Sequence, residues 1–149
     1  MFSLRSKYSI LLLLIALTCI QCQSSKRSRF LRREYKAIYI DQFKLTYIRK
    51  MLLKGYNNSI AIQEIIKSDH SGFTEPIITV EDIKLIDSLT TIDNQKMIAD
   101  SSWGSKRAEG SQGKRPLGFI YSRLESKWLD SLAKSSYKLS GLKHERHDY

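Results

Sequence analysis

The residues best suited to chemistry lie in a glycine-containing stretch near the C-terminus. Here the backbone amides of Gly110 and Gly113 are flanked by cationic side chains, a combination that can bind phosphate or sulfate. The alternative is a solvated loop with no ligand. The residues expected to contribute to such an anion-binding site are Lys106, Arg107, Lys114 and Arg115.

The same stretch lacks the features of a nucleotide-hydrolysing phosphate loop. Such a loop requires glycine five residues before Gly113, where this chain has Ala108. It also requires Ser or Thr after Lys114 to hold magnesium, and Arg115 occupies that position. The sequence therefore argues against nucleotide hydrolysis.

The histidines do not indicate a metal site. His144, His147 and Asp148 have a spacing that could place two imidazoles together on a helix, but no apolar row orders this tail. His70 stands between Asp69 and Ser71 without a partner that the sequence identifies. We predict no metal and no cofactor.

No pair of carboxylates is singled out by its spacing for acid–base work, and no cysteine lies beyond Cys22 to act as a nucleophile. We therefore predict no catalytic residues. The alternative is a small exported enzyme whose site is built from scattered residues around the 101–116 loop, which includes Trp103.

The amino terminus has the pattern of a targeting segment. Arg5 and Lys7 precede an apolar run at 10–17, and polar residues follow that run. This order is typical of a secretory signal. The run is short for a transmembrane helix, which needs about 20 apolar residues. We predict that residues 1–22 are a signal peptide or a lipoprotein signal or anchor.

Cys19 and Cys22 are the only two cysteines, so the sequence excludes a disulfide framework in the body. Ala16-Leu17-Thr18-Cys19 resembles the lipobox of bacterial lipoproteins, although Ala16 and Thr18 depart from the residues that this family prefers. The resemblance covers four residues and implies signal cleavage that leaves a lipid-modified Cys19 as the first residue. Cys22 fits the pattern less well.

A basic stretch follows the apolar run, and we expect residues 23–34 to be a tether that contacts anionic headgroups. Basic residues close to a membrane segment favour the cytoplasmic side. An uncleaved anchor with a cytoplasmic body is therefore the alternative to export. The five residues expected at the membrane surface are Lys26, Arg27, Arg29, Arg32 and Arg33.

The net charge of +10 is unevenly distributed. Residues 23–63 hold ten Lys or Arg and two acids, whereas residues 64–100 hold three Lys and eight acids. Residues 101–149 are basic again, with ten Lys or Arg and five acids. This pattern favours either solvated faces or attraction to an anionic surface. Nucleic acid is an unlikely partner for a chain with a targeting segment.

Residues 35–140 are predicted to form one mainly α domain of three to five helices, followed by a polar tail at 141–149. We predict helices ending near Lys54 and over 60–67, a third opening at Thr79, and one over 117–134. The glycine-containing stretch at 101–116 is predicted to be a long loop.

Several details of the helices follow from side-chain spacing. Asp41 is predicted to cap the first helix and Gly55 to end it. Thr79 with Asp82 three residues later predicts a capping box. The rows expected to face the core are Leu31, Tyr35, Ile38, Leu45, Ile48 and Leu52; Tyr39, Phe43, Tyr47 and Met51; Ile62, Ile65 and Ile66; Ile83, Ile86 and Leu89; and Leu117, Ile120, Tyr121, Leu124, Trp128 and Leu132.

These features favour an exported, membrane-tethered interaction protein of the cell envelope. Its partners would be the membrane, through a lipid or an anchor, and a partner protein or an anionic surface.

Overall fold

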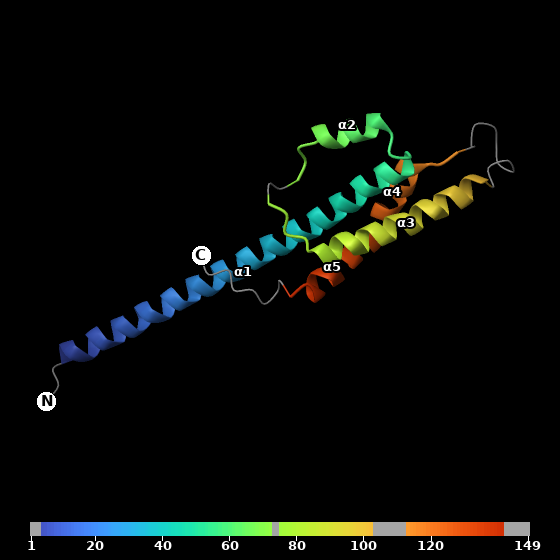
Figure 1. Cartoon of the computed structure of the whole chain (residues 1–149). Helices are drawn as coiled ribbons and strands as arrows, with labels where there is room; N and C mark the ends of the chain where they lie inside the picture. Colours follow the sequence, from blue (N-terminus) through green and yellow to red (C-terminus); the bar gives the residue numbers. More distant parts are fainter. Residues whose placement is uncertain (1–3, 73–74, 103–112, 142–149) are drawn as a thin grey trace. The chain divides into compact units, whose positions relative to one another are not determined.

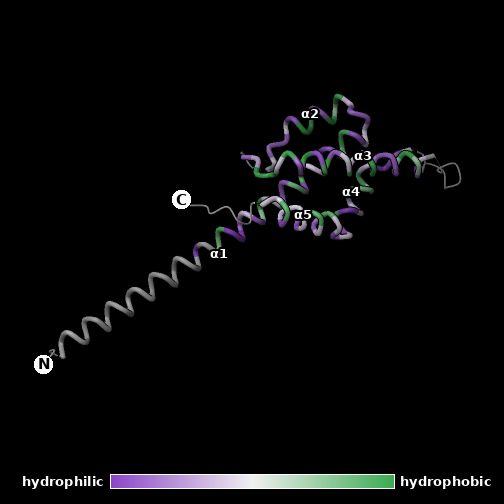
Figure 2. Tube along the Cα trace, turned by 60° about the horizontal axis from the view of Figure 1, so that its bottom comes forward, coloured by the Kyte–Doolittle hydropathy of each residue, from purple (hydrophilic) through white to green (hydrophobic). Residues whose placement is uncertain are grey.

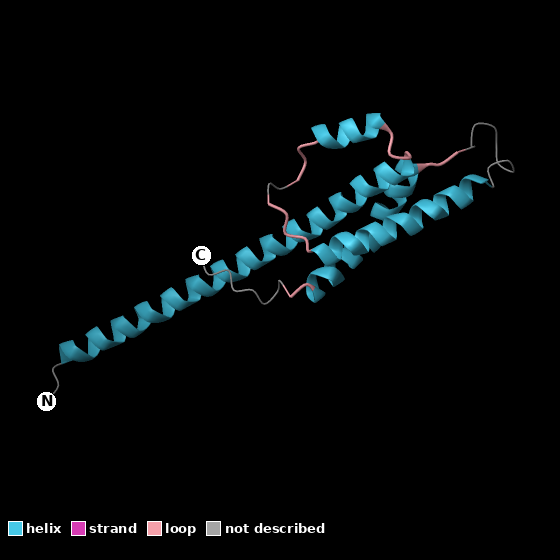
Figure 3. Ribbon diagram, viewed as in Figure 1, coloured by secondary structure: helices cyan, strands magenta, loops and turns pink. Residues whose placement is uncertain are grey.

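The computed structural model describes residues 4–72, 75–102 and 113–141, and within these ranges the side chains of residues 4–26, 28 and 102 lie outside the description. The described residues form five helices and no strand, which confirms the mainly α prediction (Figure 1, Figure 3). The helices are α1 (Leu4–Gly55), α2 (Ile60–Ser68), α3 (Val80–Ser102), α4 (Pro116–Glu125) and α5 (Trp128–Leu139).

The chain divides into two units, residues 1–36 and 37–149. In the first unit the backbone is helical from Leu4 onward. The side chains of the apolar run and of Cys19 lie outside the described ones. Within the part of the chain that the structure describes, no helix combines the length and the apolar character needed to cross a bilayer.

The core of the second unit begins with one face of α1. Tyr39, Phe43, Tyr47 and Met51 recur every fourth residue and are fully buried, which confirms the predicted row. Asp41 lies on an exposed part of the same helix, and α1 is continuous through it. The predicted cap at Asp41 is therefore wrong, because the backbone amides that it would cap are already paired within the helix.

Helix α3 runs beside the C-terminal part of α1 in the same direction. Tyr39 bonds to Asp82 near the start of α3, and Tyr47, two turns later, bonds to Asp93. In Figure 2 hydrophobic and hydrophilic residues alternate along the helices of this unit, as expected for helices that bury one face.

Helices α4 and α5 return along this pair in the opposite direction. Arg123 in α4 reaches Asp93, and Asp130 in α5 reaches Lys44, which lies one turn before Tyr47. The second unit therefore packs α1, α3 and the α4–α5 pair around one core, with Ile86, Ile120, Leu129 and Ala133 among its buried residues.

The first turn of α3 forms the predicted capping box. The amide of Asp82 donates to Thr79 Oγ1 at 3.1 Å, and the amide of Thr79 donates to Asp82 Oδ2 at 2.8 Å. Each residue's side chain thus accepts a hydrogen bond from the other residue's backbone amide, and neither amide is left unpaired. Of the predicted α3 row, Ile86 is fully buried, whereas Ile83 is 40% exposed.

The single helix predicted over 117–134 is instead two helices. Lys127 adopts a left-handed conformation (φ 54°) and separates α4 from α5. The break brings the Trp128 ring against the guanidinium of Arg123, 4.4 Å from the ring centroid. Trp128 and Asp130 also contact Tyr47 and Lys44 of α1, and such tertiary contacts override a helical pattern that the sequence alone extends.

The break also changes which side chains face the core. Leu117 and Tyr121 belong to the predicted inner stripe but are 64% and 62% exposed. The buried residues of α4 and α5 are Pro116, Ile120, Leu129, Ala133, Ser136 and Tyr137.

Helix α2 has the predicted position but not the predicted burial. None of its residues is buried, and Ile60 and Ile65 are 74% and 58% exposed. The prediction that Ile65 points inward is therefore wrong. Helical spacing defines an apolar face of α2, but it does not determine whether another element covers that face.

Candidate functional site

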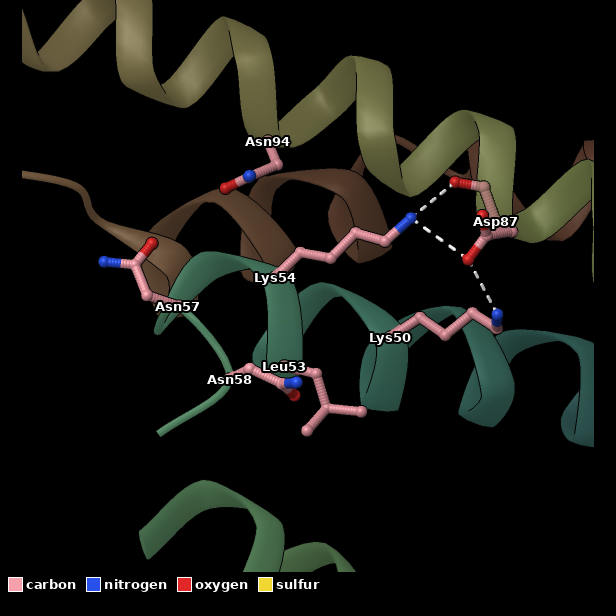
Figure 4. Close-up of a pocket in the computed structure, with 7 residues that line it drawn as sticks. All are labelled: Lys50, Leu53, Lys54, Asn57, Asn58, Asp87 and Asn94. Carbon is pink, nitrogen blue, oxygen red and sulfur yellow. Dashed lines mark hydrogen bonds and ion pairs between the residues drawn. The ribbon is translucent and has the colours of Figure 1, made fainter. Parts of the chain in front are cut away.

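A hollow with several polar side chains in its wall opens between the C-terminal end of α1, the turn that follows it, and α3 (Figure 4). Its volume is about 330 Å³, within the range of small-molecule sites. We refer to it as the asparagine–lysine pocket. Its lining residues are Lys50, Leu53, Lys54, Asn57, Asn58, Asp87 and Asn94.

Asp87 holds two lysines at one end of this pocket. Lys50 Nζ lies 2.8 Å from Asp87 Oδ1, and Lys54 Nζ lies 3.1 Å from the same oxygen. The hydrogen bonds from Lys50 and Lys54 lower the pKa of the Asp87 carboxyl, so it is ionised at neutral pH. Lys54 Nζ also donates to the Asp87 carbonyl and to Thr91 Oγ1.

The turn at the other end is held by the terminus of α1. The amide of Asn58 donates to the Leu53 carbonyl and that of Asn57 donates to the Lys54 carbonyl, which is the Schellman pattern. Asn57 and Asn58 both have positive φ, at 53° and 59°. Helix α1 ends at Gly55 as predicted, but Asn57 supplies the left-handed residue.

Asn94 completes the pocket wall, and Lys114 lies beside the pocket through its bond to Asn57. Asn94 Oδ1 is buried and has no hydrogen-bond partner among the described residues. Lys114 Nζ donates to Asn57 Oδ1 at 2.5 Å and thereby fixes that carboxamide. Lys114, a member of the predicted anion site, is thus placed beside this pocket by a contact that spans 57 positions.

Arg115 is placed along a different hollow. This second hollow, of about 310 Å³, is lined by Met97, Asp100 and Phe119 as well as by Arg115, Ser101, Gly113 and Gly118. Lys106, Arg107 and Trp103 lie outside the described residues. The anion site predicted on the 101–116 loop therefore stays a prediction as a whole.

The predicted membrane-surface residues lie on α1 in the first unit. Arg27, Arg29, Arg32 and Arg33 are exposed, and the side chain of Lys26 lies outside the described ones. Because the backbone is helical here, Arg29, Arg32, Arg33 and Lys36 follow the spacing i, i+3, i+4, i+7. That spacing places these four cations on one face of α1, which we call the basic face.

Phe30 and Leu31 accompany the basic face. Both are exposed, at 59% and 47%, so the prediction that Leu31 faces the core is wrong. Phe30 is three residues before Arg33 and therefore borders the basic face, whereas Leu31 lies on the side away from it.

The buried carboxylates have structural partners. Asp82 accepts hydrogen bonds from Tyr39, Thr79 and Ser136. Burial alone raises the pKa of the Asp82 carboxyl, but the bonds from Ser136, Tyr39 and Thr79 together hold it below its usual value. A carboxylate bound in this way caps α3 and joins three helices. Because it is buried among these partners, its role is structural.

Asp93 makes the equivalent connection at the other end of the core. It accepts from Tyr47 Oη at 2.6 Å and from Arg123 at 2.5 Å. Burial, followed by the bond to Asp93, raises the pKa of the Tyr47 phenol. The Tyr47 and Trp128 rings pack edge to face, so this charged pair is covered by aromatic side chains.

The histidines predicted to lack a ligand role fall in two places. His70 is exposed, and His144, His147 and Asp148 lie outside the described residues. Where the structure describes the chain, no group of three His, Cys, Asp or Glu side chains is arranged to hold a metal ion.

Sequence reasoning did not identify the residues that build the asparagine–lysine pocket. Lys50 and Lys54 have i, i+4 spacing and the pair Asn57-Asn58 is typical of a turn, so these signals were available. Asp87 and Asn94 had none, because only the packing of α3 on α1 brings them to this place.

Comparison of this chain with protein-family models, curated proteins and solved structures gave no match.

Proposed function

We propose that this chain is an exported, membrane-tethered interaction protein of the cell envelope, whose N-terminal unit attaches to a lipid bilayer and whose helical body binds a partner. The observation that carries the proposal is the basic face of α1, formed by Arg29, Arg32, Arg33 and Lys36. It begins ten positions after Cys19.

The basic face suits an anionic bilayer because its charges act together. Each Lys or Arg near such a surface contributes roughly 1 kcal/mol, so four on one helix face contribute roughly 4 kcal/mol. Phe30, at the edge of the basic face, adds an apolar side chain of the kind that interfacial helices insert between headgroups. Lipidation of Cys19 would supply the second signal that stable anchoring requires.

Vesicle binding tests the basic face. We expect the full chain to bind phosphatidylglycerol vesicles more tightly than phosphatidylcholine vesicles, and this preference to weaken as salt is raised. Replacing the four cations of the basic face with Gln should abolish the preference. A matched variant removes four exposed lysines of the body instead, Lys67, Lys84, Lys127 and Lys138.

The matched variant has the same net charge as the basic-face variant, so it controls for charge alone. If both variants lose the preference equally, long-range attraction explains the binding and the basic face is not the contact.

Lipid attachment is tested separately in bacterial cells fed a palmitate analogue. We expect the wild-type chain to be labelled and Cys19→Ala to remain unlabelled. Equal labelling of the two would remove lipidation from the proposal. Protection of the body from protease added to spheroplasts would favour the anchored topology with a cytoplasmic body.

A further inference from the structure

The asparagine–lysine pocket has a chemistry that the tethering function does not use. We propose that it binds a small anion that also carries hydroxyl groups, of the polyol phosphate class. The proposal rests on the donors and acceptors that the pocket wall leaves available, and on a rigid turn that holds them.

The charges around the pocket favour an anion. Lys50, Lys54 and Lys114 are opposed by Asp87, which leaves an excess of two positive charges among these four groups. Lys50 and Lys54 share one carboxylate oxygen of Asp87. The carboxylate is therefore already neutralised, and it presents little repulsion to a second anion.

The lysines differ in how many donors they retain. Lys54 Nζ has three acceptors, which match its three N–H groups. Among the described residues, Lys50 Nζ bonds to Asp87 and Lys114 Nζ bonds to Asn57, one acceptor each. Lys50 thus has N–H donors available for a phosphate at the Asp87 end, and Lys114 has donors beside the Asn57 end, whereas Lys54 is a structural residue.

The hydroxyl requirement comes from Asn94. Its Oδ1 is a buried acceptor without a donor among the described residues, a state that destabilises the unliganded fold. Figure 4 shows the carboxamides of Asn94 and Asn57 at the end of the pocket away from Asp87. A ligand hydroxyl at this end would supply the missing hydrogen bond, which inorganic phosphate bound at Lys50 does not.

The turn keeps this arrangement fixed. Asn57 and Asn58 are held at positive φ by the hydrogen bonds that end α1, and Lys114 orients the Asn57 carboxamide. A site whose polar groups are already in place loses less entropy on binding. The volume of about 330 Å³ is at the small end of ligand sites, which suits a compact polyol phosphate.

Isothermal titration calorimetry on the full chain in a non-ionic polyoxyethylene detergent tests the proposal with three probes: glycerol 3-phosphate, inorganic phosphate and glycerol. We expect glycerol 3-phosphate to bind at least about tenfold more tightly than either of the others, because it alone engages both ends of the pocket. Equal affinity for all three probes, or no saturable binding at millimolar concentration, would overturn the proposal.

Variants locate the binding. Lys50→Gln and Asn94→Leu should each weaken binding of glycerol 3-phosphate about tenfold. Lys84→Gln, which removes an exposed lysine of α3 outside the pocket, should leave the affinity unchanged. If Lys84→Gln weakens binding as much as Lys50→Gln does, the pocket is not the site.

Two further measurements complete the test. Asn94→Asp adds a carboxylate at the buried position and should abolish binding, while thermal unfolding of each variant reports whether it folds. Dihexanoyl phosphatidylglycerol, kept monomeric, distinguishes two sources of the same chemistry. If it competes with glycerol 3-phosphate, the ligand is a lipid headgroup; if it does not, the ligand is a free polyol phosphate.

Discussion

Tyr39 Oη donates a hydrogen bond of 2.7 Å to Asp82 Oδ2, and both side chains are buried although 43 positions separate them in the chain. The same carboxylate closes the capping box with Thr79 and accepts from Ser136 in α5. One carboxyl group thereby joins α1, α3 and α5. The stability of the body should depend on this group more than on any exposed ion pair.

Tyr39→Phe should lower the free energy of unfolding by about 2 kcal/mol, because it removes a buried hydrogen bond to a charged group. The measurement is urea denaturation of the full chain, followed by circular dichroism. Tyr121→Phe is the matched control, since Tyr121 is exposed and bonds to Glu125 within α4. Its effect should stay within about 0.5 kcal/mol. If both variants lose a similar amount of unfolding free energy, the buried Tyr39–Asp82 bond stabilises the fold no more than the exposed bond of Tyr121 does.

Acid should remove the contribution of Asp82. Its pKa in the folded state is lower than in the unfolded chain, where Asp has a pKa of about 3.9. The stability that Asp82 contributes is therefore fully present above about pH 4 and is lost as the pH falls through the folded-state value. Asp82→Asn should be less stable than wild type at pH 7, and the difference should shrink below about pH 4.

The measurement is the free energy of unfolding of both chains from pH 7 to pH 2. Asp41→Asn, which removes an exposed carboxylate of α1, is the control for the loss of one acidic group. A difference between Asp82→Asn and wild type that stays constant over the whole range would show that ionisation of Asp82 does not stabilise the fold.

Lys127→Gly should stabilise the body by about 1 kcal/mol. The left-handed conformation of Lys127 is unfavourable for a residue with a Cβ atom, whereas glycine adopts it without a steric clash. The same substitution at Lys84, inside α3, should destabilise by about 1 kcal/mol. Thermal unfolding of the two variants and of wild type measures the expected gain of stability at position 127 and the expected loss at position 84. A loss of stability at position 127 would mean that the Lys127 side chain makes contacts that outweigh the backbone effect.

How much of the fold the sequence predicts can be judged from particular residues. Helical spacing identified the buried row that includes Tyr39 and Tyr47, and the Thr79–Asp82 capping box, because both depend on neighbours within one helix turn or two. The break at Lys127 does not follow from the sequence, since it accompanies contacts of Trp128 and Asp130 with distant residues of α1. The exposure of Ile65 was missed for the same reason: its surroundings come from other elements.

The pocket shows the same limit. Lys114 was identified as an anion-binding candidate from its sequence context, but its partner Asn57 is 57 positions away. The buried acceptor on Asn94 is created by packing and leaves no pattern in the sequence.

Gly55 marks the end of α1, and its lack of a side chain matters for packing and not for a left-handed turn. Its φ is not positive, whereas an added Cβ would lie 2.7 Å and 2.8 Å from two side-chain carbons of Pro116. Gly55→Ala should therefore destabilise the body by about 1–3 kcal/mol, because the proline ring has no flexible end that can yield. Gly118→Ala is the opposite case, since nothing lies within 4 Å of its added Cβ and the residue is inside α4. That variant should be more stable than wild type by roughly 0.5–1 kcal/mol. Chemical denaturation of both variants measures the two effects, and a Gly55→Ala chain as stable as Gly118→Ala would show that α1 and α4 do not approach at this point.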